Sequence, residues 1–130
     1  MKHQLNNVAE FHKVFDNTDK DSPSLIDPKV YELRYKLMME ETDEYYQACQ
    51  ENDIVGIADA LGDQLYILCG TILKHGLQHK IEEVFNEIQA SNMSKLGPDG
   101  KPIYREDGKI LKGPGYFKPN ISAIIYGKDC

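Results

Sequence analysis

The segment from Ile54 to Leu73 constrains the fold of this chain more than any other feature of the sequence. It is apolar on nearly every side of a helix, which is typical of a central, buried helix. The segment is long enough to span a membrane, but Asp59 and Asp63 interrupt it, and a membrane interior disfavours carboxylates. We therefore expect a helix over Asp53–His75 at the centre of a helical domain.

Other segments repeat apolar residues at helical spacing. We expect helices over Asn6–Asp16, Pro28–Glu51 and Gln78–Lys95 in addition to the apolar one. Asp27 suits the N-cap of the second helix, and Gly76 suits the residue that ends the third. These helices predict an all-α protein built on a four-helix bundle.

The chain changes in character after Lys95, where glycine and proline recur too often for a long helix. The pair Asp107-Gly108 is a strong turn signal, and Pro102–Arg105 and Lys109–Lys112 flank it as the two arms of a small hairpin. We therefore expect a single domain over residues 1–130, with the helical bundle in 1–95 and a basic, hairpin-like tail in 96–130.

Charge is distributed unevenly along the chain, and its net sign excludes some classes of binding partner. The net charge of −6 divides into −9 for residues 1–94 and +3 for residues 95–118. An acidic chain binds nucleic acid duplexes and membrane surfaces poorly, so we expect no nucleic acid and no membrane partner. The three cysteines are far apart and the N-terminal residues lack the apolar core of a signal peptide, so we expect a cytoplasmic protein.

Acidic residues concentrate on the two central helices. Glu40, Glu41 and Glu44 share a face of the second helix, and Asp59 and Asp63 share a face of the third. A solvated surface is enough to explain the three glutamates on their own. It does not explain two aspartates in the most apolar helix, where an unpaired carboxylate is strongly disfavoured.

Two facing sets of carboxylates favour a bound cation. Hard oxygen ligands from facing helices suit Mg²⁺, with Mn²⁺ as the alternative. A buried salt bridge is the competing explanation, but the third helix has no basic residue before Lys74. Because Mg²⁺ commonly binds one or two carboxylates together with substrate phosphates, the pattern predicts a magnesium site.

The order of these motifs resembles the all-α nucleoside triphosphate pyrophosphohydrolase superfamily, which includes MazG-like enzymes, dimeric dUTPases and phosphoribosyl-ATP pyrophosphohydrolase. Its signature is EExxE on one helix and ExxD on the next, binding Mg²⁺. Glu40–Glu44 match the first motif and Asp63 matches the end of the second, whereas Ala60 stands where the family has Glu. Asp59 lies beside that position, one turn from Asp63, so we expect it to assist as a ligand.

A second match lies in Ser91–Lys95 and Asp107–Tyr116, which resemble the segment after the fourth helix in one branch of these enzymes. The resemblance implies Mg²⁺-dependent hydrolysis of a nucleoside triphosphate, such as dGTP or dUTP, between its α- and β-phosphates. The products would be the monophosphate and pyrophosphate, and the cellular task would be control of a nucleotide pool.

The resemblance also implies roles for the acidic residues. Glu41, Glu44 and Asp63 would bind the metal, with Asp59 assisting. Glu40 would position or deprotonate the attacking water, and Glu40 and Glu41 could exchange these roles.

The remaining candidates would contact the substrate. Those expected to bind its phosphates are Asn92, Lys95, Lys109, Lys112 and Tyr116. In the first helix, Asn7 and Phe11 are candidates for contacts with the base, although Phe at helical spacing is more often part of a core. His12 has no partner at metal-ligand spacing, so we expect it at the surface.

Two alternative functions remain open from the sequence. The substrate could be the phosphoribosyl nucleotide of phosphoribosyl-ATP pyrophosphohydrolase, or the chain could be a non-catalytic helical regulatory or interaction module that kept the acidic motif. In either enzymatic case the apolar surface of the third helix predicts a homodimer or a homotetramer.

Overall fold

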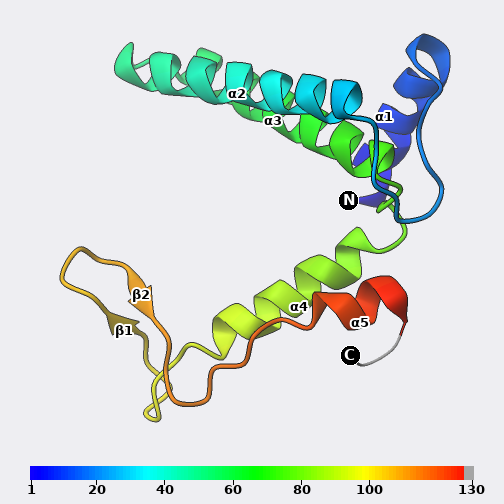
Figure 1. Cartoon of the computed structure of the whole chain (residues 1–130). Coiled ribbons are helices and arrows are strands. Elements are labelled where there is room, and N and C mark those ends of the chain that lie inside the picture. The colour runs from blue at the N-terminus through cyan, green and yellow to red at the C-terminus, as the bar shows by residue number, and fades with distance from the viewer. Residues whose placement is uncertain (128–130) are drawn as a thin grey trace. The chain divides into compact units, whose positions relative to one another are not determined.

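The computed structural model describes residues 1–127, and Cys130 therefore lies outside the described residues. The chain forms two compact units, Met1–His79 and the part from Lys80 onwards, each with its own packing (Figure 1). Its secondary structure is almost entirely helical, which confirms the predicted all-α class. No helix in the described residues is long and apolar enough to cross a lipid bilayer.

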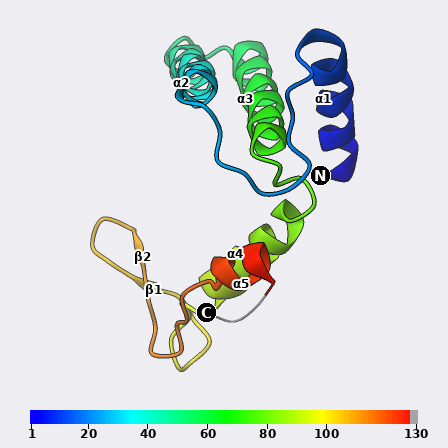
Figure 2. The same cartoon turned by 45° about the vertical axis from the view of Figure 1, so that its right-hand side comes forward.

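The first unit consists of α1 (Lys2–Phe15), α2 (Pro28–Gln50) and α3 (Ile54–Lys74). In Figure 2, α3 lies between the other two helices and packs against both of them. The core of this unit therefore gathers around α3. Its buried apolar members are Leu5, Val8, Ala48, Ala60, Cys69, Ile72 and Leu73.

Local chemistry sets the ends of the two long helices. Asp27 caps α2 by accepting a hydrogen bond from the Lys29 amide at 2.9 Å, and Asp53 caps α3 by accepting from the Gly56 amide at 3.0 Å. Between them Asn52 adopts a positive φ of 54°, which asparagine tolerates better than most residues. The short connection sends α3 back along α2, so residues far apart in the sequence meet across the pair.

The second unit consists of α4 (Ile81–Met93), a two-stranded hairpin and α5 (Ile121–Tyr126). Strands β1 (Ile103–Tyr104) and β2 (Ile110–Leu111) pair antiparallel around the Asp107-Gly108 turn, as the sequence predicted. The segment after β2 returns to the end of α4. There the Gly113 amide donates to the Lys95 carbonyl at 2.8 Å.

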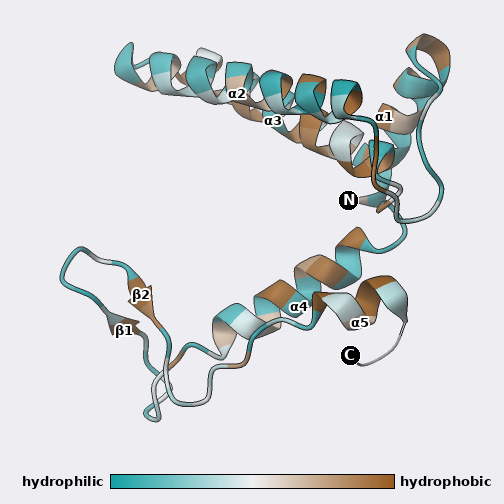
Figure 3. Cartoon of the chain, in the orientation of Figure 1, coloured by the Kyte–Doolittle hydropathy of each residue, from teal (hydrophilic) through white to brown (hydrophobic). Residues whose placement is uncertain are grey.

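The apolar helix α3 is less buried than its sequence predicts. Leu61 is 49 % exposed, Leu65 42 % and Leu68 46 %, because α1 and α2 cover only part of its circumference. Figure 3 shows the hydrophobic colouring of α3 against the more polar α2. The prediction of a fully buried third helix is therefore wrong for the single chain.

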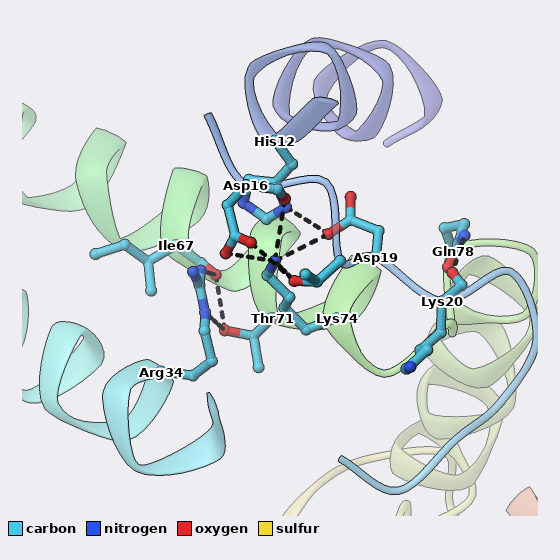
Figure 4. Close-up of polar contacts among 10 residues, drawn as sticks. His12, Asp16, Asp19, Lys20, Arg34, Ile67, Thr71, Lys74 and Gln78 are labelled. Carbon is cyan, nitrogen blue, oxygen red and sulfur yellow. Dashed lines mark hydrogen bonds and ion pairs between the residues drawn. The ribbon is translucent and has the colours of Figure 1, made fainter. Parts of the chain in front are cut away.

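A buried polar network closes the end of the first unit (Figure 4). Lys74 is 2 % exposed, and its ammonium donates to Asp16 Oδ2 at 2.8 Å and to Thr18 Oγ1 at 2.6 Å. Asp19 lies 3.4 Å from the same ammonium and 2.7 Å from His12 Nδ1. His12 is only 6 % exposed, so the expectation of a surface histidine is wrong. Asp19 supplies the polar partner that makes its burial favourable.

Candidate active site

Three carboxylates from two helices converge in the first unit. Glu41 and Glu44 lie one turn apart on α2, and Asp63 faces them from α3. One carboxylate oxygen from each residue lies within 4.8 Å of the other two. The two acidic motifs of the sequence are thus brought together at one point of the α2–α3 pair.

Glu41 is the least exposed of the three residues in this cluster. Its Oε2 is buried and has no hydrogen-bond partner. Desolvation first, and then the neighbouring Glu44, Asp63 and Asp59, raise the pKa of the Glu41 carboxyl to about 7. A carboxylate held in this way binds a proton or a metal cation more readily than one in water.

No basic side chain within residues 1–127 forms an ion pair with the cluster. Among residues 1–127, every ion pair formed by a lysine, arginine or histidine side chain involves a carboxylate other than Glu41, Glu44 and Asp63. Three hard oxygen donors, one with an unused buried lone pair, match the ligand set that Mg²⁺ and Mn²⁺ prefer. The residues present therefore fit a divalent cation.

Two other predicted acids stand apart from this triad. Glu40 and Asp59 are exposed and are not among the three residues whose oxygens converge. Asp59 still acts on the site, because its charge contributes to the raised pKa of Glu41. Ala60, which replaces the glutamate of the superfamily motif, is 2 % exposed and belongs to the core.

One hydrogen bond links the two helices beside the cluster. Gln64 Nε2 donates to Thr42 Oγ1 at 3.1 Å, and Thr42 Oγ1 in turn donates to the Met38 carbonyl at 2.9 Å. Thr42 follows Glu41 directly, and Gln64 follows Asp63. The sequence analysis did not single out either residue, although each adjoins an acidic motif.

The predicted phosphate-binding residues all belong to the second unit. Lys95 follows α4, and its carbonyl accepts from Gly113, which places it next to Lys112 in the fold. The Lys112 ammonium lies 4.7 Å from the centre of the Tyr116 ring, a cation–π contact. Lys109 follows the hairpin turn and is exposed. Asn92 is exposed near the end of α4.

The two candidates for base contacts lie on α1 and are placed differently. Asn7 lines a cavity of about 120 Å³ between α1 and α3. Phe11 is 45 % exposed and contacts Tyr66 edge-on, with ring centres 5.8 Å apart. Phe11 is thus not a core residue, and it reaches the cavity only through Tyr66, which also lines it.

Comparison with known proteins decides the family. The profile of the phosphoribosyl-ATP pyrophosphohydrolase family, PRA-PH, matches residues 8–92, which include both acidic motifs. The chain belongs to this family. The PRA-PH family is one of hydrolases that act on nucleotide phosphoanhydride bonds, so the predicted superfamily and enzyme class are confirmed.

Two relatives extend the comparison. A crystal structure from Exiguobacterium sp. 255-15, of a protein provisionally named an NTP pyrophosphohydrolase, aligns with a TM-score of 0.55 and 27 % identity over 95 % of this chain and 94 % of that one. "Uncharacterized protein L479" of Acanthamoeba polyphaga mimivirus is 35 % identical over 80 residues, or 60 % of this chain. The match spans only 28 % of the viral protein.

Proposed function

We propose that this PRA-PH family member hydrolyses a nucleoside triphosphate between its α- and β-phosphates in a Mg²⁺-dependent reaction. Water attacks the α-phosphorus, the bond from that phosphorus to the bridging oxygen breaks, and pyrophosphate leaves. The products are the nucleoside monophosphate and pyrophosphate. Candidate substrates are deoxynucleotides such as dUTP and dGTP, and control of a nucleotide pool is the proposed task.

The observation that carries this proposal is the uncompensated acidic triad. Glu41, Glu44 and Asp63 converge within 4.8 Å, and a buried oxygen of Glu41 has no partner. We propose that these three residues hold Mg²⁺, with Mn²⁺ as a substitute and with Asp59 assisting. When bound, the ion supplies positive charge that stabilises the anionic phosphates of the substrate.

The protein's own side chains have the other roles in this proposal. Glu40, which is exposed on the same helix as the triad, positions the attacking water or accepts its proton. Glu41 can exchange that role with Glu40, because its pKa of about 7 suits a general base at neutral pH.

We propose that the basic tail contributes phosphate contacts. The ammonium groups of Lys95, Lys109 and Lys112 are suited to a pyrophosphate leaving group, and Asn92 and Tyr116 are suited to neutral hydrogen bonds. The half-exposed apolar residues of α3 support a homodimer or a homotetramer, since such a surface is more stable when covered by another copy.

Pyrophosphate release from the common ribonucleoside and deoxyribonucleoside triphosphates, measured with Mg²⁺ and with a chelator, tests the proposal. We expect turnover of at least one nucleotide with Mg²⁺ and none with chelator. Phosphoribosyl-ATP belongs in the same panel, because the matching family is named for that substrate. Absence of turnover on every substrate, by protein with an intact helical spectrum, would leave the non-catalytic module as the better explanation.

A further inference from the structure

Hydrogen bonds join α2 and α3 at both ends of their contact. At one end Arg34 donates from Nε to Thr71 Oγ1 at 3.0 Å and from Nη2 to the Ile67 carbonyl at 2.8 Å (Figure 4). At the other end the Asp53 amide, at the start of α3, donates to the Ala48 carbonyl of α2 at 3.0 Å. The two helices are therefore held together at both ends of the pair.

The acidic triad lies midway between these two ends. Glu41 is seven residues from both Arg34 and Ala48, which is two helical turns, or about 10 Å, in either direction. Across from Glu41 lies Asp63, with a carboxylate oxygen within 4.8 Å of one of its own. Repulsion between these like charges pushes the helices apart, whereas a shared cation requires them to stay close. The middle of the pair thus needs a contact that fixes the spacing of the helices.

A hydrogen bond between Gln64 and Thr42 supplies such a contact. Gln64 Nε2 of α3 donates to Thr42 Oγ1 of α2 at 3.1 Å. Within residues 1–127, the only other side-chain hydrogen bonds between these helices are those of Arg34. Thr42 directly follows Glu41, and Gln64 directly follows Asp63. The bond therefore connects the two backbones beside the facing carboxylates.

The direction of this bond is fixed from the α2 side. A threonine hydroxyl has one proton, and Thr42 donates its proton to the Met38 carbonyl at 2.9 Å. The hydroxyl oxygen can therefore only accept from Gln64, whose amide nitrogen must point to α2. Gln64 is the one carboxamide of α3, a helix composed mostly of apolar residues. Its presence there is explained by the bond that it makes to α2.

A contribution to folding does not explain the bond well. The contact is exposed, and a hydrogen bond that water can replace stabilises a fold only slightly. Residues that hold metal ligands in place have a larger effect, since their loss commonly weakens metal binding by about tenfold or more. The position of the bond, next to two proposed ligands, favours this second role.

The spacing of the helices also bears on the choice of cation. Mg²⁺ binds oxygens at about 2.0–2.1 Å and demands near-ideal octahedral geometry, whereas Ca²⁺ binds them at about 2.3–2.6 Å in a flexible arrangement. A site held at fixed spacing therefore discriminates against the larger ion. A site free to widen accommodates Ca²⁺ and loses part of its affinity for Mg²⁺.

We propose that Thr42 and Gln64 form a positioning pair that fixes the spacing of α2 and α3 at the acidic triad and makes the site select Mg²⁺ over Ca²⁺. This role rests on the proposed function, since it requires that the triad bind Mg²⁺. Neither side chain is itself a ligand. Their effect passes through the backbone, from Thr42 to Glu41 and from Gln64 to Asp63.

Calorimetric titration of the protein with Mg²⁺ alone and with Ca²⁺ alone tests the pair. Thr42→Val replaces the hydroxyl by a methyl group, and Gln64→Met keeps the length of the side chain without the amide. Each variant should bind Mg²⁺ about tenfold more weakly, while its Ca²⁺ affinity changes by less than about twofold. An unchanged ratio of the two affinities in either variant would overturn the proposal.

A rescue and a matched control make the result specific. Thr42→Ser keeps the hydroxyl and should restore the wild-type ratio. Gln47 Nε2 donates to Glu51 Oε1 at 3.2 Å, an exposed bond of the same kind that does not reach α3. Gln47→Met should therefore leave the ratio unchanged. Equal falls of the ratio in Gln47→Met and Gln64→Met would contradict the role given to the bond between helices.

NMR of the metal-free protein reads out the bond itself. Thr42→Val should shift the side-chain amide signal of Gln64, and Thr42→Ser should bring it back. The backbone amide signals of α1 should stay in place in both variants, which excludes a general loss of structure. A Gln64 signal that does not respond to Thr42→Val would show that the bond is absent in solution, and the pair would be rejected.

The outcomes separate this proposal from the hydrolytic function. Selective Mg²⁺ binding that is lost in Thr42→Val, in a protein that turns over no nucleotide, would support the pair and contradict the hydrolase. Mg²⁺-dependent turnover with a ratio that is unchanged in the variants would contradict the pair alone. A wild-type protein that binds neither cation would contradict both the pair and the proposed metal site.

Discussion

Helix α3 takes part in two clusters of charged residues that differ in one respect. At its C-terminal end the Lys74 ammonium lies within 3.4 Å of Asp19 and within 2.8 Å of Asp16, so opposite charges meet. Near its middle Asp63 meets Glu41 and Glu44, and only like charges are present. Among the described residues, side chains of the protein neutralise the charge of the first cluster but not that of the second.

The difference distinguishes a polar cluster that stabilises the fold from the acidic cluster that we propose to bind a metal ion. The Lys74 network ties the residues after α1 to the end of α3, and a balanced, hydrogen-bonded group of this kind needs nothing from outside (Figure 4). The acidic triad brings only like charges together, so we expect it to lower the stability of the metal-free fold and the proposed cation to offset that cost. The following predictions test this contrast, from the largest expected effect to the smallest.

Removing the Lys74 ammonium from its cluster with Asp16 and Asp19 should lower the free energy of unfolding more than any other change considered. Lys74→Met removes the cation that pairs with the part-buried Asp19 and with Asp16, which is 56 % exposed, and loss of such charge-assisted hydrogen bonds costs about 2 kcal/mol. Chemical denaturation should show this loss in the free energy of unfolding. Lys13→Met, at an exposed position of α1, is the control and should change stability little. A loss of equal size in both variants would refute the contrast.

Metal binding to the triad should depend on pH near neutrality. Glu41 must lose its proton to bind a cation, and its pKa is about 7. Apparent Mg²⁺ affinity, measured by calorimetry, should therefore fall by about tenfold between pH 8 and pH 6. In Glu41→Gln affinity should be weak at both values. An affinity of the wild type that is flat over this range would show that Glu41 is not a ligand.

Removing charge from the triad should stabilise the metal-free protein. Glu41 binds its proton more tightly in the fold than in the unfolded chain, so stability should fall as the pH rises from 4.5 to about 7. Asp16 has a lowered pKa because of its hydrogen bond with Lys74, so its contribution is lost only below pH 3.8 and does not interfere.

Glu41→Gln should accordingly gain about 0.5–1 kcal/mol at pH 8 without metal, as expected for relief of a few like-charge contacts. Thermal unfolding at pH 5 and pH 8, with and without Mg²⁺, would measure the gain and its sign. Excess Mg²⁺ should reverse the order and make the wild type the more stable protein. Destabilisation of the metal-free variant at pH 8 would contradict this account.

The smallest effect concerns the hydrogen bond that joins the two helices beside the triad. Thr42→Val removes the acceptor of Gln64 and should cost about 0.5 kcal/mol of stability, because this contact is exposed. Thr42→Ser keeps the hydroxyl and should restore the stability. Failure of Thr42→Ser to recover it would mean that the threonine methyl, and not the hydroxyl, matters.

Local signals made much of the fold predictable. Asp27 and Asp53 cap the helices that they precede, and the Asp107-Gly108 pair turns the hairpin. These features depend on residues a few positions apart, which a sequence displays directly. The six-residue helix Ile121–Tyr126 was missed because it is too short to show a period.

Features that depend on packing were harder to predict. His12 is buried because it pairs with Asp19, which also contacts Lys74 at the end of α3. Neither partner belongs to the helix that contains His12. Phe11 is half exposed because its partners are Phe15 and Tyr66 at the surface, and not the core. Nothing in the spacing of α1 reveals how that helix is rotated against α3.

The candidate site also has a part that the sequence predicted and a part that it did not. The acidic motifs were visible from the sequence because both lie at fixed spacing on long helices. The cavity between α1 and α3 was not, since it depends on how the two helices meet.

One matched pair of variants tests the central claim that the unbalanced triad supports hydrolysis. Glu44 and the adjacent Asp43 are both exposed, but only Glu44 belongs to the triad. Pyrophosphate release with Mg²⁺ should fall by about a hundredfold or more in Glu44→Gln and stay near the wild-type rate in Asp43→Asn. Equal rates in the two variants, whether both high or both low, would contradict the claim.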